Sequence, residues 1–186
     1  MNSNGRLPVF TIGHGGRTAE QLLALLAEHH IGYLIDVRSV PFSKYQPEFD
    51  QHSIEPLAAA KGIQYLAMGD SLGGRPKDPT CYLDGAVDYE LCQTKEWFQK
   101  GIARLKHAVT GGHRVALLCS ELRPEMCHRT KLIGRELALQ GTQVVHIDET
   151  DALVEQGAVL ARITGGQAQL FGDDAGVTLS RKRYRP

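Results

Sequence analysis

The sequence predicts one α/β domain: an open, mostly parallel sheet of five strands, flanked by helices in a doubly wound, three-layer arrangement. Three observations support this fold. Short β-branched, apolar segments recur along the 186 residues, helical segments separate them, and a helix, a glycine and a strand twice follow one another. That succession is typical of the crossovers that join parallel strands.

The first strand is predicted over residues 9–12 and ends at a glycine-rich turn. Thr18 and Gln21 then have the spacing of a capping box, which opens a helix. Residues 33–37 form the next apolar run and predict the second strand.

A short helix over residues 54–61 and a third strand over residues 63–67 follow. Residues 69–85 are rich in Gly, Pro and Asp, which predicts a long irregular loop. Loops of this length in a compact domain are often functional.

The second half of the chain supplies the last two strands. Thr94 is expected to cap a helix that runs to residue 109, and residues 115–118 form a clear buried strand. Pro124 suits the first turn of the next helix, which leads to a fifth strand over residues 144–147.

We assign residues 1–157 to the α/β domain and residues 158–186 to a polar, glycine-rich tail with a basic end. Because few apolar side chains could anchor it, this tail is expected to be loosely ordered.

Composition narrows the functional classes. Lys plus Arg and Asp plus Glu are both 21, which argues against binding polyanions over the whole surface. No apolar run approaches the roughly 20 residues of a membrane span, and the first residues lack a signal-peptide pattern. The four cysteines are too few for a disulfide scaffold. We therefore expect a cytoplasmic protein that does not contact membranes.

Polar residues follow three of the five predicted strands and the start of one helix. In an open parallel sheet, functional groups gather beyond the carboxyl ends of the strands, so these side chains are expected to converge. A thiol in a first helical turn would also have a lowered pKa. The candidate catalytic residues are His14, Asp36, Cys119, Glu121, Cys127 and His128.

Basic residues fall on the same loops. The candidate anion-binding residues are Arg38, Lys44, Arg75, Arg123 and Arg129. Each residue alone could be a turn, ion-pair or core residue. Because a neutral chain concentrates its arginines at one rim, the set favours a phosphate-bearing substrate, either a nucleotide or a nucleic acid.

Five short motifs carry a family resemblance. They are Thr11 to His14, Asp36 to Arg38 followed by Pro41 and Ser43, Leu72 to Arg75, Cys119 to Glu121, and Cys127 to Arg129. In this order they resemble the bacterial and archaeal family known as domain of unknown function 488, over roughly residues 10–147. The resemblance implies a compact α/β domain with a site at the strand ends, and it supplies no reaction.

The first functional hypothesis is an enzyme that uses thiol or acid–base chemistry. Arginines would bind the anion, His14 or His128 would move a proton, and Asp36 or Glu121 would orient or assist. Cys127 is the better candidate nucleophile, because its predicted setting is electropositive. The chain has no phosphate-binding Walker loop, nucleophile elbow or dinucleotide fingerprint.

A second hypothesis is a zinc-dependent hydrolase or deaminase. Cys119, Cys127, His128 and His14 would bind the ion, with Glu121 as a base, and these ligand types suit zinc. The spacing counts against zinc. Seven residues separate the two cysteines, and Cys127 and His128 are adjacent, so on a helix they would point about 100° apart. Neither a metal nor a cofactor is therefore expected.

A third hypothesis is a binding module of DNA metabolism. Gln167, Leu170 and Phe171 resemble the short Gln-x-x-Leu-Phe peptide with which bacterial replication and repair proteins dock onto the sliding clamp. The same apolar residues could instead fold back onto the domain. The basic residues 181–185 suit weak phosphate contact.

Overall fold

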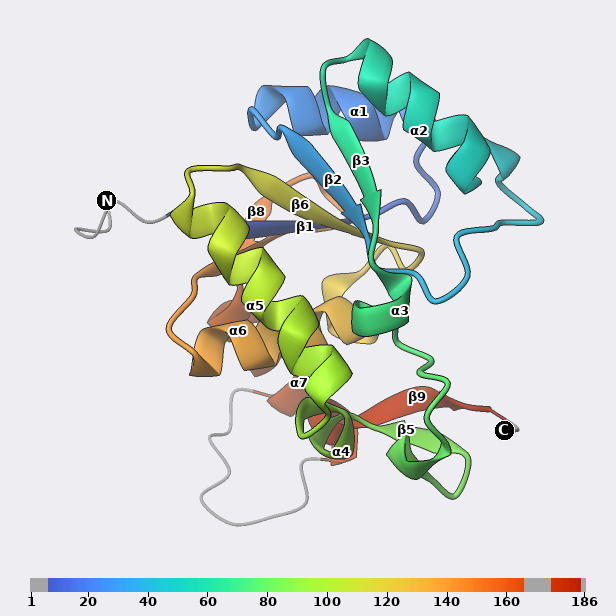
Figure 1. Ribbon diagram of the computed structural model, residues 1–186, viewed down its shortest axis with the longest axis vertical. Helices are drawn as coiled ribbons and strands as arrows, with labels where there is room; N and C mark the ends of the chain where they lie inside the picture. Colours follow the sequence, from blue (N-terminus) through green and yellow to red (C-terminus); the bar gives the residue numbers. More distant parts are fainter. Residues whose placement is uncertain (1–6, 166–174, 185–186) are drawn as a thin grey trace.

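A six-stranded sheet crosses the part of the chain that the computed structural model describes, residues 7–165 and 175–184 (Figure 1). Its strands are β1 (Val9–Gly13), β2 (Tyr33–Asp36), β3 (Gln64–Ala67), β6 (Val115–Cys119), β7 (Val144–Ile147) and β8 (Leu153–Glu155). The strand order is β3-β2-β6-β1-β7-β8. The first five run parallel, as the sequence predicts, and β8 adds an antiparallel edge that it does not predict.

Helices cover both faces of this sheet (Figure 1). Leu22 of α1 (Ala19–Glu28) and Ile54 of α2 (Gln51–Ala60) belong to one apolar core. Phe98 of α5 (Glu96–Thr110) and Leu137 of α6 (Arg135–Leu139) belong to the other. Side chains of β6 alternate between the two cores, so the strand is buried on both faces and is apolar throughout.

The sequence predicts capping residues for two helices, and the structure has one of the two. The Thr18 side chain accepts from the Gln21 amide while the Gln21 side chain accepts from the Thr18 amide, so the capping box is confirmed. The expectation that Thr94 caps α5 is wrong. Thr94 ends α4 (Tyr89–Gln93), its hydroxyl donates to the Leu91 carbonyl, and α5 begins after Lys95.

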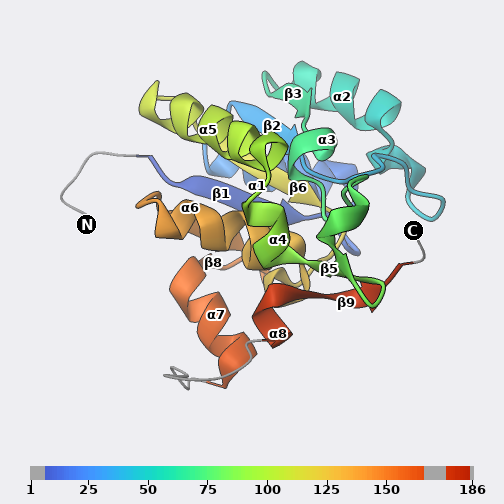
Figure 2. The same ribbon diagram turned by 60° about the horizontal axis from the view of Figure 1, so that its bottom comes forward.

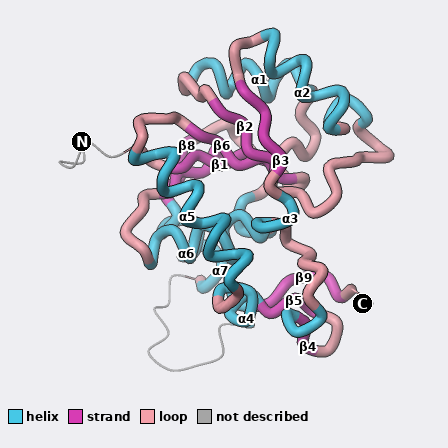
Figure 3. Tube along the Cα trace, in the orientation of Figure 1, coloured by secondary structure: helices cyan, strands magenta, loops and turns pink. Residues whose placement is uncertain are grey.

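The predicted loop over residues 69–85 contains regular structure. It includes α3 (Gly69–Leu72), the 3₁₀ turn η2 (Pro79–Cys81) and strand β4 (Tyr82–Leu83). Strand β4 begins a small antiparallel sheet in the order β4-β5-β9, with β5 at Ala86–Asp88 and β9 at Leu179–Arg183 (Figure 3).

The segment between β6 and β7 is broken into pieces, where the sequence predicts one helix from Pro124. It consists of the 3₁₀ turn η3 (Pro124–Met126), the π-helical turn η4 (Arg129–Gly134) and α6. The break falls at Cys127, whose backbone is extended, with φ −119° and ψ 148°. On the other side of the sheet, a 3₁₀ turn also precedes a helix: η1 (Pro47–Phe49) comes before α2.

The last part of the chain is more ordered than expected where it is described. Helix α7 (Gln156–Thr164) extends past residue 157, and α8 (Ala175–Thr178) leads into β9, which pairs with β5 (Figure 2). Gln167, Leu170 and Phe171 lie outside the described residues, so the docking peptide stays a prediction, as does the domain boundary. Within the described ranges, no helix is long and apolar enough to span a membrane.

Candidate functional site

Three strand ends meet at the centre of the sheet, because β2, β6 and β1 are neighbours. The amide of His14 donates to the carbonyl of Cys119 at 2.9 Å, and the amide of Val37 donates to the carbonyl of Leu118 at 3.1 Å. These bonds carry the ladder past the ends of β1 and β2, so the residues that follow the three strands are held side by side.

The candidate residues lie in two groups on opposite faces of the sheet. Asp36 is in register with Leu118, which faces the α1–α2 core, whereas Cys119 faces the α5–α6 core. Successive side chains of a strand point to opposite faces, so strand ends that meet do not bring all their side chains together. His14, Asp36 and Arg38 form one group, and Cys119, Glu121, Cys127 and His128 form the other.

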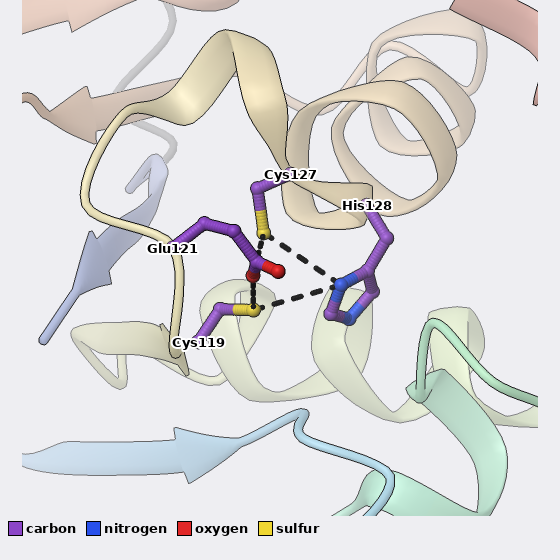
Figure 4. Close-up of side chains that lie close together, drawn as sticks. All are labelled: Cys119, Glu121, Cys127 and His128. Carbon is purple, nitrogen blue, oxygen red and sulfur yellow. Dashed lines mark hydrogen bonds between the residues drawn. The ribbon is translucent and has the colours of Figure 1, made fainter. Parts of the chain in front are cut away.

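The second group, here called the Cys-His cluster, consists of Cys119, Glu121, Cys127 and His128 (Figure 4). The Cys119 thiol lies 2.9 Å from Oε2 of Glu121, and the Cys127 thiol lies 3.4 Å from the same oxygen. Both sulfur atoms are 3.6 Å from Nδ1 of His128. One potential ligand atom from each residue lies within 4.8 Å of the other three, so the cluster could hold a metal ion.

The break at Cys127 explains how two adjacent side chains converge. Cys127 is extended and His128 has helical dihedral angles, φ −61° and ψ −22°, so the two are not successive residues of one helix. The divergence of about 100° expected from helical spacing does not arise here. The objection to a metal that rested on the adjacency of Cys127 and His128 is therefore removed, and the two cysteines meet in one cluster although seven residues separate them.

Three members of the Cys-His cluster, Cys119, Glu121 and His128, have shifted pKa values. Burial raises the pKa of the Cys119 thiol well above its ordinary value. Burial alone would lower the pKa of His128, but the neighbouring Cys119 and Glu121 raise it. For Glu121, burial opposes ionisation, but the hydrogen bond from Cys119 and the charge of His128 lower its pKa. Between Cys119 and Glu121, the carboxylate is therefore the favoured anion.

Arg129 holds the loop that carries Glu121. Its side chain is fully buried, and its two Nη atoms donate to the carbonyl oxygens of Glu121 and Leu122. The same loop rests on Gly13, where a Cβ atom would lie 1.8 Å from the Glu121 carbonyl oxygen. Arg129 is thus placed beneath the site rather than at its mouth.

The other group is a paired, buried network. Arg38 Nε donates to Oδ1 of Asp36 at 2.9 Å, and the Tyr65 hydroxyl donates to Oδ2 of Asp36 at 2.6 Å. His14 stacks on Phe49 with ring centroids 4.4 Å apart, and burial lowers the pKa of His14. Sequence reasoning missed Tyr65. It could have been found from its position on β3, the strand that pairs with β2.

A cleft of about 320 Å³ opens above the Cys-His cluster. Cys119, Glu121 and His128 line it from below. Its remaining lining includes three cations and two tyrosines, namely Arg75, Arg181, Lys182, Tyr89 and Tyr184. The guanidinium of Arg75 lies over the ring of Tyr184, 4.4 Å from its centroid.

Much of the far wall of the cleft comes from β9 and the residue after it. Arg181, Lys182 and Tyr184 were missed as site residues, because the sequence shows only a basic end far from the strand-end motifs. Of the predicted anion-binding residues, Arg38 and Arg75 line the cleft. Lys44 and Arg123 do not, and Arg123 lies 3.5 Å from Glu149 in an ion pair.

Comparison with known proteins gives one match. The model of the family described as "Domain of unknown function DUF488" matches residues 18–135. The match includes the whole Cys-His cluster and the motifs at residues 36–38 and 72–75, while Thr11 to His14 precede it and β9 follows it. A search of the curated proteins and of the solved structures returned no match.

Proposed function

This chain belongs to the DUF488 family, and we propose that it is an enzyme that acts on a phosphate-bearing substrate. The substrate is a nucleotide or a nucleic acid, bound in the cleft above the Cys-His cluster. The observation that carries the proposal is that one cleft combines two kinds of residue. Its floor is formed by Cys119, Glu121 and His128, and its basic rim by Arg75, Arg181 and Lys182.

The rim supplies the anion-binding part. Arg181 and Lys182 are exposed, and neither has an ion-pair partner among the described residues. Arg75 is held by its stacking on Tyr184 and by the hydrogen bond from its amide to the Ser39 hydroxyl. Cations that are free of carboxylates suit phosphate oxygens, which accept charge-assisted hydrogen bonds.

Arg38, whose guanidinium belongs to the buried network with Asp36, is also among the residues that line the cleft. Nη1 of Arg38 has no hydrogen-bond partner among the described residues, although Asp36 and the Phe49 carbonyl bind the rest of its guanidinium. An unsatisfied buried donor costs about 1–3 kcal/mol, so such groups in a site often mark where a ligand or water completes the bonds.

The floor supplies the reacting groups. Glu121 and His128 both line the cleft, and together they offer a carboxylate and an imidazole for proton transfer to a bound substrate. Cys119 lies beside them, and its raised pKa argues against a free thiolate nucleophile at neutral pH. Acid–base chemistry is therefore the form of the hypothesis that we propose.

The test compares binding of AMP, ADP and a short single-stranded oligonucleotide with binding of adenosine. Combining Arg181→Ala with Lys182→Ala should weaken binding of the phosphorylated ligands about a hundredfold or more, because each of the two lost charge-assisted contacts is worth about 1.5–3 kcal/mol. Adenosine should be affected much less. The matched control combines Lys61→Ala with Arg104→Ala, two exposed cations outside the cleft. Equal affinities of the rim variant and the control would overturn the phosphate-binding cleft.

Catalysis is tested separately with Glu121→Gln. Product formation from a ligand that binds should fall at least a hundredfold, as expected when a general acid or base is lost. Binding should stay within about threefold if Glu121 serves chemistry more than affinity. Unchanged turnover would remove Glu121 from the reaction.

A further inference from the structure

We infer that the Cys-His cluster is a binding site for a zinc ion, with Cys119, Cys127 and His128 as ligands and Glu121 as the fourth ligand on the side of the cleft. The inference concerns metal binding by these four side chains and holds whatever the substrate is. With the ion bound, His128 is a ligand through Nδ1, so the proton transfer proposed above would fall to Glu121 when its carboxylate is off the ion. It reverses the expectation from the spacing of the residues, whose helical premise fails at Cys127.

The distances fit a tetrahedral ion. With Zn–S bonds of about 2.3 Å and Zn–N bonds of about 2.0 Å, a sulfur and a nitrogen ligand lie about 3.5 Å apart. Both thiols are 3.6 Å from Nδ1 of His128, and the Cys127 thiol is 3.4 Å from Oε2 of Glu121. Of these four separations, the 2.9 Å between Cys119 and Glu121 must lengthen, by roughly 0.5 Å, to reach the same geometry.

His128 is prepared for binding through Nδ1. Its Nε2 lies 3.1 Å from the carbonyl oxygen of Val37, so Nε2–H donates there and Nδ1 keeps its lone pair. A backbone carbonyl on the far ring nitrogen is a usual second partner of a histidine that binds metal, because it fixes the tautomer and the ring orientation. Gly74 leaves room for the ring, since a Cβ atom there would lie 2.7 Å from His128 Cγ.

The sulfur atoms are also placed as thiolates would be. The backbone amide of Arg129 points its hydrogen at the Cys127 sulfur, 3.5 Å away, and such donors stabilise negative charge on sulfur. Cys119 and Cys127 are 3% and 1% exposed, so an unbound thiolate pair would be costly and a bound cation offsets that cost.

The donor set selects the metal. Two thiolates and an imidazole favour zinc over magnesium or calcium, which prefer oxygen ligands. Cys119, Glu121 and His128 line the cleft, whereas Cys127 does not. If Glu121 moves aside, the coordination position it leaves faces the cleft, where water or a substrate oxygen can enter. Three protein ligands with one open position are the pattern of catalytic zinc sites.

The first experiment is elemental analysis of the full-length, untagged protein. We expect about one zinc per chain, lost in Cys119→Ser and in Cys127→Ser and kept in Cys92→Ala. Cys92 is the matched control, because it is a buried cysteine outside the cluster. Folded Cys119→Ser and Cys127→Ser proteins that both retain a full equivalent of zinc would overturn the site.

The second experiment needs no variant, so it decides the matter if the serine variants do not fold. The wild-type protein is stripped with a chelator and titrated with Co²⁺. We expect strong visible absorption that saturates near one equivalent, as tetrahedral cobalt–thiolate complexes give. Absence of both zinc in the purified protein and this absorption would overturn the inference. Nucleotide binding by the stripped protein is measured separately, so a failed metal site is distinguishable from a failed phosphate site.

Discussion

The fully buried guanidinium of Arg129 donates to the carbonyl oxygen of Glu121, and in this way the start of η4 is tied to the loop that follows β6. Two members of the Cys-His cluster, Cys127 and His128, immediately precede Arg129 in the sequence. One side chain therefore fixes the distance between the two segments from which the whole cluster is built.

Arg129→Lys tests this tie. Lysine keeps the charge but loses the planar fork that reaches two carbonyls, and it leaves acceptors unsatisfied. We expect the free energy of unfolding to fall by about 2–4 kcal/mol in urea denaturation, as for other broken buried networks. Arg123→Lys is the control, since Arg123 is on the same loop and its side chain is 65% exposed. A loss no larger than that of the control would show that Arg129 does not hold the loop.

Gly13→Ala tests the close approach of the same loop to β1. The added Cβ would lie 1.8 Å from the Glu121 carbonyl oxygen and 2.5 Å from Nη1 of Arg129, so the loop must move. We expect a loss of about 1–3 kcal/mol, typical of overpacking, together with lower zinc content. Gly16→Ala is the control, because nothing lies within 4 Å of its Cβ position. Similar unfolding curves and similar zinc content for the two variants would contradict the prediction.

Asp36→Asn tests the buried ion pair on the other face. Both side chains of the pair are almost fully buried, at 1% and 3% exposure, so removing the carboxylate leaves Arg38 as an uncompensated charge. Losses of about 3–5 kcal/mol are typical of that change. Tyr65→Phe removes only one hydrogen bond to Asp36 and should cost about 1 kcal/mol. The prediction is wrong if denaturation ranks the two variants the other way.

His146 gives a pH dependence of stability. It is buried between the Thr11 hydroxyl and the Gln156 side chain, and burial lowers its pKa from 6.5 to about 4. Between these values the unfolded chain binds the proton and the folded chain does not, so stability falls as the pH falls. The loss from this group is about 2 kcal/mol between about pH 7 and pH 5.

The measurement is the unfolding free energy at both pH values for wild type and His146→Gln. The variant should lose about 2 kcal/mol less than wild type over this interval. Exposed His52→Gln should behave as wild type does. An equal pH dependence in all three proteins would exclude His146 as the source.

The sequence predicts the sheet well for a physical reason. Strands buried on both faces are continuous apolar runs, and β1, β6 and β7 are of this kind, with β2 nearly so. The edge strand β3 is buried at Tyr65 and exposed at Gln64 and Ala67. The meeting of polar residues at the strand ends follows from the parallel arrangement alone. Neither result needs the order of the strands.

What the sequence does not predict depends on longer-range geometry. The register of β2 beside β6 pairs Asp36 with Leu118, so Asp36 and Cys119 face opposite cores. The extended backbone at Cys127 interrupts a segment whose apolar spacing is helical, and that spacing does not record the break. The return of β9 to β5 pairs segments about 90 residues apart, which no local pattern records.

The position of β9 bears on how members of this family can differ in what they bind. The family match ends at residue 135, so it contains the Cys-His cluster but not Arg181 or Lys182. The proposed reacting groups and much of the proposed recognition surface are thus carried by separate stretches of chain, joined in space by the pairing of β9 with β5. A relative could exchange that final strand, and with it the molecules it accepts, without altering a residue of the cluster.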